Sequence, residues 1–403
     1  MISLTRQAGE ALLRNFAPRM GESYARERNY DQGPGRHEFV SCLSPYVRRR
    51  LVLEQDLIDA ALGAHGPKRA EKFIQEVFWR AYFKGWLEQR PTVWQDYVVG
   101  LAADLGALAS DPALAAHIEV AESGQTGIEC FDSWTHELLQ TGYLHNHARM
   151  WFASIWIFTL RLPWRIGADF FYRHLLDGDP ASNTLSWRWV AGLHTRGKAY
   201  VAEAGNIYRY SRERFRPAPN QLVQVAGGLE HTEPEGQPDR VPLRKPRSPD
   251  PALESAVLLT EEDCRLEDFA AHFLNVKGAA ALAASALRSP RSVSDTVTRA
   301  EEEALADAAE RSGFACSLLR AGDRASFLAW IDRLAVKQVV TPFVPQGPLR
   351  DWLLACEPAL SARGIVICEW QRPFDRLVWP HASAGFFKVK EHIPSLIRAF
   401  QQS

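Results

Sequence analysis

The spacing of large apolar residues changes once along the chain. Up to about Arg212 they recur at i, i+3, i+4 and i+7, as in residues 68–87 and 169–176, which is the pattern of amphipathic helices. Farther on, short β-type runs such as residues 256–260 and 364–370 alternate with helical runs. This order predicts a nearly all-α half followed by a parallel sheet with crossover helices, a Rossmann-like α/β arrangement.

A stretch rich in Pro, Gly and charged residues separates the two halves. Residues 215–252 contain "RPAPNQ", "GGLEHTEPEGQPDR" and "RKPRSPDP", and such a composition does not support a core. We therefore expect a helical domain over residues 1–214, a linker over 215–252 and an α/β domain over 253–403. A last helix is predicted for Phe387 to Gln401.

The net charge of −1 over 403 residues excludes a nucleic-acid partner recognised through bulk charge, so a phosphate-binding face would have to be local. Tyr46 to Arg90 offers one, with nine Lys/Arg against six Asp/Glu, although a solvated helical surface explains it equally well. The six cysteines lie far apart and indicate neither a zinc site nor a disulfide frame. His145 and His147 lack a third ligand, so no metal is predicted.

The start of the chain reads as an amphipathic helix rather than a signal peptide. The longest uncharged apolar run, Met150 to Leu160, has eleven residues, whereas a bilayer span needs about 20. We expect a buried core helix there, no membrane segment and a cytoplasmic protein.

Polar side chains that could hold a dinucleotide gather on the predicted helices, since no strand is followed by a G-x-G-x-x-G turn. They are Tyr24, the "SCLS" at Ser41 to Ser44, Arg149, Asp177, Asp179 and Asn183. Hydroxyls and amides at helix starts suit a diphosphate, but "SCLSP" also reads as a plain N-cap. Likewise "DGDPASN" also reads as a helix stop and turn. Arg149 is expected to pair with Asp177, because an unpaired buried carboxylate is costly.

Tryptophans also point to this part of the chain. There are 13 in all, and Trp164, Trp187 and Trp189 stand near these polar residues in the sequence. Core packing explains most tryptophans. Trp187 and Trp189 are two residues apart, so they point in different directions on either a helix or a strand. One can lie against a cofactor while the other faces a groove.

The motifs "GESYARERNY", "VSCLSPY", "QEVFWR", "TGYLHNHARM" and "DGDPASN" together resemble the DNA photolyase and cryptochrome family, over most of Gly21 to Gly192. The resemblance is nearest to the cyclobutane pyrimidine dimer photolyases. It implies an FAD-binding helical domain. The implied FAD-binding residues are Tyr24, Ser41, Leu43, Ser44, Arg149, Asp177, Asp179 and Asn183. Val40 stands where the family's phosphate loop usually has Thr.

The resemblance also implies a catalytic set, in which Glu76, Trp79, Asn146 and Met150 would hold the damaged bases. Glu76 is typical of repair enzymes, because many cryptochromes lack it. Asn146 stands where (6-4) photolyases have His, which favours a cyclobutane dimer. The implied DNA-binding residues are Arg80, His147, Trp189, Arg196 and Lys198, with further phosphate contacts from Arg48 to Arg50 and Lys72. His147 replaces an Arg common in the family.

Trp187 and Trp164 match the inner and middle members of the family's electron-transfer chain of tryptophans. No Trp stands near Asp111, where the outer member is expected, so the chain is either rerouted through Trp156 or a Tyr, or truncated. The order of elements after residue 253 is similar to the family's antenna domain, which normally precedes the flavin domain. A generic α/β domain is the alternative. Antenna chromophore binding stays open, because "TEEDCRL" has acids where arginines are common.

The resemblance implies light-driven repair of cyclobutane pyrimidine dimers by electron transfer from reduced FAD, the activity of a deoxyribodipyrimidine photo-lyase, a carbon-carbon lyase. The partner would be single- or double-stranded DNA containing dimers, and the protein a monomer. The alternative is a cryptochrome-like blue-light photoreceptor that binds FAD and signals without repairing DNA. A third option is a degenerate relative with a structural flavin.

Overall fold

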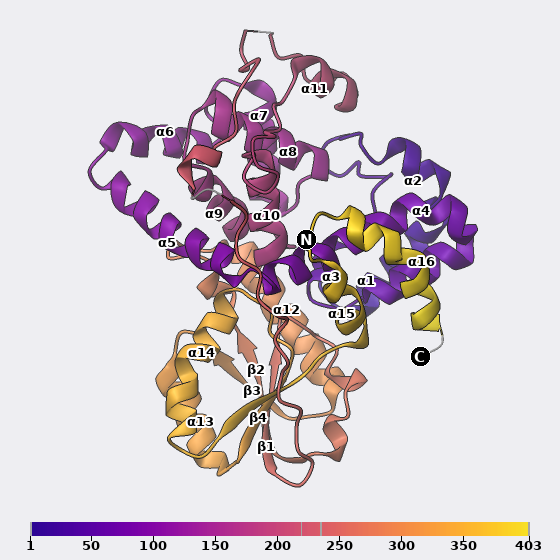
Figure 1. Ribbon diagram of the computed structural model, residues 1–403, viewed down its shortest axis with the longest axis vertical. Coiled ribbons are helices and arrows are strands. Elements are labelled where there is room, and N and C mark those ends of the chain that lie inside the picture. Colours follow the sequence, from indigo (N-terminus) through magenta and orange to yellow (C-terminus); the bar gives the residue numbers. More distant parts are fainter. Residues whose placement is uncertain (1, 219, 234–235, 402–403) are drawn as a thin grey trace. The chain divides into compact units, whose positions relative to one another are not determined.

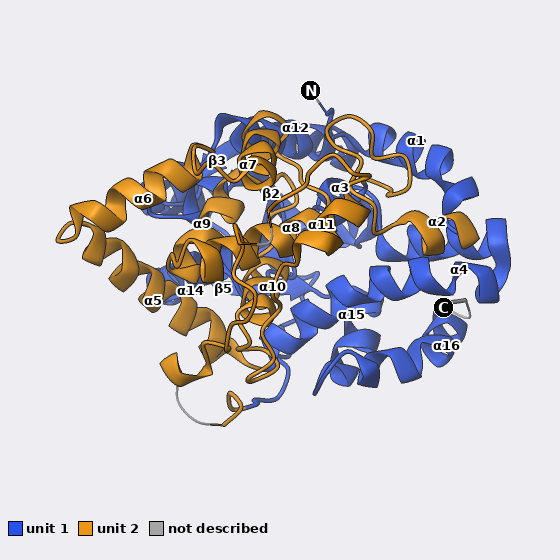
Figure 2. Ribbon diagram, turned by 90° about the horizontal axis from the view of Figure 1, so that it is seen from above, with its two compact units in different colours: residues 1–21, 43–89, 240–403 blue, residues 22–42, 90–239 orange. Residues whose placement is uncertain are grey.

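A computed structural model describes residues 2–218, 220–233 and 236–401. Backbone packing divides the chain into two compact units, coloured separately in Figure 2. Unit 1 comprises residues 1–21, 43–89 and 240–403, and unit 2 comprises residues 22–42 and 90–239. The predicted functional domains 1–214 and 253–403 stay a prediction, and the compact units run across their limits.

Unit 2 consists of helices and connecting segments. Its elements are α2 (Glu22–Glu27), α5 (Pro91–Leu108), α6 (Pro112–Glu122), α7 (Glu129–Thr141), α8 (Asn146–Ser154), the π-helical turn η2 (Ile155–Thr159), α9 (Trp164–His174), α10 (Pro180–Val190), α11 (Ala204–Tyr210) and η3 (Glu230–Thr232). Figure 1 labels the α-helices of this unit and colours the ribbon along the sequence. The predicted helix over residues 169–176 is confirmed for residues 169–174, the second half of α9, which ends before Leu175. Gly142, at φ 67°, ends α7 in the left-handed conformation that glycine adopts without strain.

The apolar run from Met150 forms the end of α8 and η2, and Trp151 to Phe158 are buried. The prediction of a buried core helix is confirmed for these residues. No single helix in the described ranges is long and apolar enough to cross a membrane. The pair α5 and α6 passes that test by length and composition only, and is bent by 113°.

The buried Asp31 links three segments of unit 2 by hydrogen bonds. Its fully buried carboxylate accepts hydrogen bonds from the indole of Trp134 (3.0 Å), the Arg214 guanidinium (2.6 Å) and the backbone N–H of Gly33 (3.0 Å). Its own N–H donates to the carbonyl of Tyr210 (2.8 Å). Because charge-assisted bonds in a dry interior are strong, Asp31 joins the loop after α2 to α7 and to the segment after α11.

Unit 1 is built around a five-stranded sheet in the order β3-β2-β1-β4-β5, in which every pairing is parallel. Its elements are α1 (Arg6–Phe16), η1 (Ala17–Arg19), α3 (Ser44–Arg48), α4 (Glu54–Glu88), β1 (Glu254–Thr260), η4 (Leu266–Asp268), η5 (Ala271–Phe273), β2 (Asn275–Ala283), η6 (Ser285–Arg288), α12 (Asp295–Ser312), β3 (Cys316–Arg320), α13 (Arg324–Leu334), β4 (Gln338–Pro342), α14 (Pro348–Ser361), β5 (Val366–Trp370), α15 (Pro373–Val378), η7 (Trp379–His381) and α16 (Phe387–Gln401). The predicted parallel sheet with crossover helices is confirmed.

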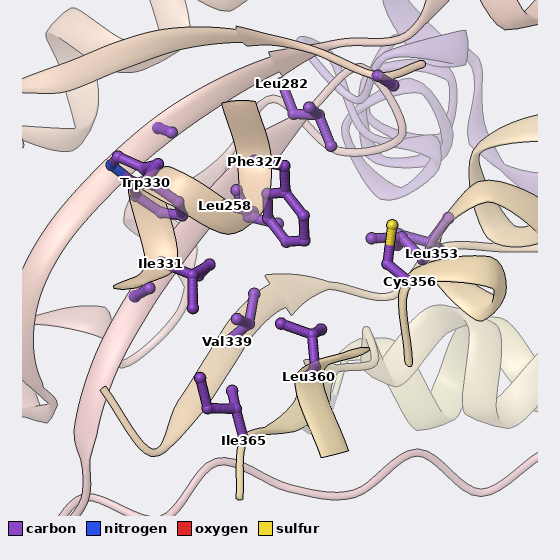
Figure 3. Packing of buried hydrophobic residues seen from close by; sticks show 14 of the residues in the cluster. Leu258, Leu282, Phe327, Trp330, Ile331, Val339, Leu353, Cys356, Leu360 and Ile365 are labelled. Atoms are coloured by element: carbon purple, nitrogen blue, oxygen red, sulfur yellow. The ribbon is translucent and has the colours of Figure 1, made fainter. Parts of the chain in front are cut away.

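Helices cover the sheet as right-handed crossovers require. Strands β2 and β3 are added in turn on one side of β1. The chain then crosses to the other side of β1, where it adds β4 and β5. Helix α12 therefore lies on one face, and α13 and α14 share the other. On that shared face Phe327 of α13 and Leu353 of α14 pack against Leu258 and Val339 in the main buried cluster (Figure 3).

Strand β2 was missed by the sequence analysis. Its residues, "NVKGAAALA", are rich in Ala and contain Gly278, and both residue types are uncommon in strands. The strand forms because β1 and β3 hydrogen-bond it on both sides and residues 279–283 are buried. The secondary structure of such a segment is determined by its neighbours in the fold rather than by its own residue preferences.

The predicted phosphate contacts at Arg48 to Arg50 are wrong. All three side chains are buried in unit 1, with exposed fractions of 1%, 0% and 4%. Arg48 pairs with Glu262 (2.6 Å) and Arg49 with Glu261 (3.1 Å). Arg50 pairs with Asp375 (2.7 Å) and Asp263 (3.3 Å). The acids Glu261 to Asp263 directly follow β1, so the basic run at the end of α3 neutralises acids at the carboxyl end of a strand.

Replacing Arg50 with Met tests the weight of this buried cluster. The variant leaves the Asp375 carboxylate buried without the guanidinium, whose charge opposes the effect of burial in raising the pKa of that group. We expect the free energy of unfolding to fall by roughly 3–5 kcal/mol, as for other broken buried pairs, measured by urea unfolding. Arg363→Met is the control, because Arg363 pairs with Asp332 on the surface. Equal stability losses in both variants would contradict the assignment.

Helix α4 is two helices that meet at Gly66, whose φ of 68° and ψ of 169° are not helical, followed by Pro67. Proline is accommodated at this position because a first turn of helix needs no donor from its N–H. The predicted helix over residues 68–87 is confirmed as the second of these parts. The second part carries Glu76, Trp79 and Arg80 on one side, at i, i+3 and i+4.

Candidate functional site

An ion pair between α8 and the turn before α10 forms the centre of the polar residues in unit 2. Arg149 donates from Nη2 to Asp177 (2.9 Å) and from Nε to the carbonyl of Leu144 (2.8 Å). The predicted pairing of Arg149 with Asp177 is present. Burial alone would lower the pKa of Arg149, but the Asp177 carboxylate raises it above its usual value. The Arg149 guanidinium therefore stays charged beside Asp177, which is only 7% exposed.

Tyr143 and Cys42 lie beside this pair and were not singled out in the sequence. The Arg149 guanidinium lies 5.6 Å from the centre of the Tyr143 ring, and His37 packs edge-on against the same ring at 5.0 Å. Burial raises the pKa of the Cys42 thiol to about 11, which a hydrogen bond with Tyr143 partly opposes. The thiol is therefore protonated near neutral pH and is no nucleophile. No sequence motif marks either residue.

The turn from Asp177 to Asp179 and the first turn of α10 hold the other predicted acids and the amide. Asp179 caps α10 by accepting a hydrogen bond from the N–H of Ser182 (2.8 Å). Asn183, one turn on, donates from Nδ2 to the carbonyl of Ala168 in α9 (2.8 Å). Asp179 and Asn183 are 1% and 8% exposed. The turn interpretation of "DGDPASN" is thus confirmed, and the same geometry fixes a buried amide and two carboxylates.

The predicted phosphate-contact residues fall on both sides of a unit boundary in the chain. Tyr24 is buried on α2 and Ser41 is half-buried, both in unit 2. Leu43 and Ser44 belong to unit 1, where α3 begins at Ser44 with no side-chain N-cap bond. The plain N-cap interpretation of "SCLSP" is therefore wrong.

Trp187 and Trp189 point in different directions, as predicted, since Trp187 is 2% exposed and Trp189 36%. The Trp187 ring packs on α9 so closely that a Cβ at Gly167 would lie 2.4 Å from it. Trp156 lies perpendicular to Trp187 with ring centres 6.4 Å apart. Among the described residues, the Nε1 of Trp187 has no hydrogen-bond partner.

Trp164 stands one turn before Gly167 on α9 and begins a second aromatic series. Its ring centre is 5.9 Å from that of Tyr97, which is 5.4 Å from that of Trp94 on the same helix, α5. Trp156 instead neighbours Phe131, Phe152 and Phe170. A rerouted electron-transfer chain through Trp156 or a Tyr stays a prediction.

In unit 1, Trp79 lies in an aromatic cluster. Its ring stacks on Phe386, just before α16, with centres 3.9 Å apart and planes 12° from parallel. Tyr82 packs edge-on at 5.4 Å. Glu76 and Arg80 are half-buried, and Arg80 has two buried nitrogens without a hydrogen-bond partner among the described residues. The contact with Phe386 joins residues too distant in sequence for any motif to indicate it.

At the start of α8 in unit 2, Asn146 is exposed and Met150 half-buried. His147 bonds the carbonyl of Asn29 through Nδ1 (2.9 Å) and stacks on Trp151 with ring centres 4.3 Å apart. The other predicted DNA contacts differ in exposure. Trp189 stacks on Tyr200, Arg196 donates to the carbonyl of Glu230 (3.1 Å) and Lys198 is exposed.

His145 caps α8 in its neutral form. Its Nδ1 accepts from the N–H of His147 (3.2 Å), and its Nε2 bonds the carbonyl of Arg28 (3.0 Å). These two bonds need one acceptor and one donor nitrogen, which only the neutral ring offers. Burial lowers the pKa of His145 from 6.5 to about 4, despite the Asp31 charge, which raises it.

We therefore expect unfolding of the protein to become easier in acid. Above about pH 6.5 His145 is neutral in both the folded and the unfolded protein, and its contribution to stability is fully present. As the pH falls from about 6.5 towards about 4, only the unfolded protein takes up the proton, so the free energy of unfolding falls by about 1.4 kcal/mol per pH unit. Urea unfolding at several pH values measures that slope. His145→Gln should be less stable near neutral pH and have a shallower slope. An unchanged slope would contradict the buried neutral histidine.

Comparison with known proteins matches residues 73–215 to the family profile described as the FAD binding domain of DNA photolyase. The deoxyribodipyrimidine photo-lyase of Escherichia coli is 27% identical over 237 residues, which cover 56% of this chain and 48% of the relative. That of Streptomyces griseus is 35% identical over 157 residues, which cover 39% of this chain and 33% of the relative. The chain thus spans half or less of the length of these curated relatives.

Two solved structures are similar to parts of the chain. A bacterial class III photolyase from Agrobacterium tumefaciens has 23% identity and a TM-score of 0.43, over 52% of this chain and 43% of that chain. A Synechocystis cryptochrome has 24% identity and a TM-score of 0.42, over 52% of this chain and 45% of that chain.

Proposed function

We propose that this chain, part of which is similar to the FAD binding domain of DNA photolyase, binds FAD and uses blue light to repair cyclobutane pyrimidine dimers in DNA. The observation that carries the proposal is the Arg149–Asp177 ion pair (2.9 Å) with the buried Asp179 and Asn183 beside it. All four residues lie within the segment matched to the FAD binding domain.

The residues present fit a flavin. Its ring edge both donates and accepts hydrogen bonds, and the turn before α10 offers carboxylates while Asn183 offers an amide held by Ala168. When bound, reduced FAD would supply the electron that splits the dimer. In the proposal Asp177, Asp179, Arg149 and Asn183 orient the ring, and Tyr24, Ser41, Leu43 and Ser44 bind its phosphates. Trp187 and Trp164 would carry electrons towards it.

The proposed lesion contacts come from two helices. Glu76 would accept and orient the polar edge of the dimer, Trp79 would provide an aromatic wall, and Asn146 and Met150 would border it. Arg80, His147, Trp189, Arg196 and Lys198 are the proposed DNA contacts. We further propose that the FAD domain is the helical one and that the α/β, antenna-type domain follows it. No second chromophore is assigned.

A cryptochrome-like photoreceptor is the second candidate, and one observation favours it. Phe386 covers a face of Trp79 at 3.9 Å, so that face is already used in stacking. A protein that signals needs no aromatic wall for a base. Repair requires the other face, or rotation of Phe386.

The decisive experiment incubates the purified protein, loaded with FAD and reduced, with a thymine-dimer oligonucleotide in blue light and in darkness. Light-dependent loss of dimers is the expected result. Flavin that binds and is photoreduced without loss of dimers would replace the repair proposal with the photoreceptor. Failure to bind FAD would overturn both.

Arg149→Met tests the flavin site separately. The variant removes the guanidinium that pairs with Asp177 and with it the proposed orienting contact. We expect the Kd of FAD to rise by tenfold or more, which is about 1.4 kcal/mol, so that less FAD is retained after gel filtration. Arg165→Met is the matched control, because Arg165 pairs with Asp104 in the same unit (3.3 Å). Equal FAD retention in the two variants would contradict the site.

Glu76→Gln tests the lesion site. The substitution keeps the size of the side chain but removes the carboxylate, so we expect about tenfold slower repair, equivalent to one hydrogen bond of about 1.4 kcal/mol in the transition state. FAD binding should not change. The control is Glu71→Gln on the same helix, which is exposed. Repair at the normal rate by Glu76→Gln would remove Glu76 from the catalytic set.

A further inference from the structure

The end of α11 and the residues after it form a basic and aromatic surface in unit 2. Residues 208–216, "YRYSRERFR", contain four arginines against one glutamate, a local charge of +3 in a chain of net charge −1. Arg209, Arg212 and Arg216 are exposed. We define the Arg–Tyr surface as Tyr30, Tyr208, Arg209, Tyr210, Arg212 and Arg216. None of these residues was assigned a role above.

Each exposed arginine of this surface lies over a tyrosine ring. The distance from the guanidinium carbon to the ring centre is 3.9 Å for Arg212 over Tyr30, 4.7 Å for Arg216 over Tyr208 and 5.2 Å for Arg209 over Tyr210. Arg216 also donates to the Tyr208 hydroxyl (3.0 Å). These contacts order the planar groups before any ligand arrives, which lowers the entropy lost on binding.

The charges of this surface are only partly neutralised. Arg212 pairs with Glu27 at 2.5 Å, and Arg26 shares the same carboxylate at 2.7 Å. Within the described part of the chain, Arg209 and Arg216 have no carboxylate partner. Two ordered cations therefore remain for an anionic ligand.

An aromatic row connects this surface to the start of α8. Tyr30 lies 5.1 Å from Tyr210, and Tyr210 lies 5.2 Å from His147, which stacks on the fully buried Trp151 at 4.3 Å. The bond from the N–H of Asp31 to the carbonyl of Tyr210 (2.8 Å) holds the two segments together. His147 follows Asn146, which the proposed function assigns to the lesion. The surface thus begins next to the proposed lesion contacts of unit 2.

We propose that the Arg–Tyr surface binds single-stranded DNA beside the lesion, which rests on the proposed function and adds a preference for the unpaired strand. Interleaved aromatic and basic groups bind unpaired bases by stacking and phosphates by charge. A guanidinium plane can stack on a base as well as bond a phosphate. In a duplex the base faces are already stacked on each other, so a duplex meets only the charges of this surface.

The test measures binding of labelled, undamaged oligonucleotides in darkness by fluorescence anisotropy, with single-stranded and duplex DNA of one sequence over a series of salt concentrations. The informative variant is the double substitution Arg209→Lys and Arg216→Lys, which keeps both charges and removes both planes. We expect it to bind single-stranded DNA about tenfold more weakly, the size of one lost stacking contact. Its duplex affinity should stay within about twofold, as expected from charge alone.

The double substitution of the same residues by Ala should weaken binding to both forms of DNA. For single-stranded DNA it should reduce the slope of log affinity against log salt by about 1.4, or about 0.7 for each lost phosphate contact. The matched control is Arg320→Ala, an exposed arginine of unit 1 that pairs with Glu302, and it should bind as the wild type does.

The proposal is overturned if the Lys variant keeps its single-strand affinity, if the wild type binds duplex as tightly as single strands, or if RNA of the same sequence binds more tightly than DNA. Its failure is distinguishable from that of the proposed function, because binding in darkness needs no flavin chemistry. If the protein prefers single strands but shows no light-dependent repair, the Arg–Tyr surface stands and the proposed repair function falls. If it repairs dimers without that preference, the repair function stands and the proposal for the surface falls.

Discussion

Unit 1 depends on the neutralisation of buried charge by charge. The three arginines at the end of α3, Arg48 to Arg50, have their carboxylate partners in the acids that follow β1 and in Asp375 of α15. Buried ions without partners cost several kcal/mol each, so neither group can be buried alone. Arg372 adds a second bond to Asp263 at 2.6 Å. These ion pairs explain why "TEEDCRL" carries acids at the end of β1, and why residues 43–89 pack with the sheet in unit 1.

The sequence was enough to predict most helices and the parallel sheet, because apolar residues recur at helical spacing in α4 and α9 and form a short, fully buried run in β1. It failed at β2, where Ala and Gly give no β signal, and at the arginines of residues 48–50, whose composition resembles that of a binding surface. The pairing of Arg149 with Asp177 could be predicted from two motifs and from the energetic cost of an unpaired buried charge. The stacking of Trp79 on Phe386 could not be predicted, because contacts between residues distant in sequence depend on the completed fold.

The polar residues of unit 2 share one physical property: buried charge or hydrogen-bonding capacity held in a single arrangement. Asp31 accepts from Trp134 and Arg214, His145 caps α8 as the neutral ring, and Arg149 holds Asp177. Few alternative arrangements satisfy so many donors and acceptors in a dry interior. Such rigidity suits a site that must orient a planar ring, because positioning is what a protein contributes when the chemistry belongs to a bound cofactor.

The division of unit 1 into three separate stretches of chain also governs the order in which the protein can fold during synthesis. Residues 43–89 leave the ribosome long before the strands and acids that complete their packing, at about 5–20 residues per second. Until residues 240–403 follow, the three arginines lack the carboxylates that neutralise them. Unit 1 can therefore complete its folding only after residues 240–403 are made, when all of unit 2 has already been synthesised.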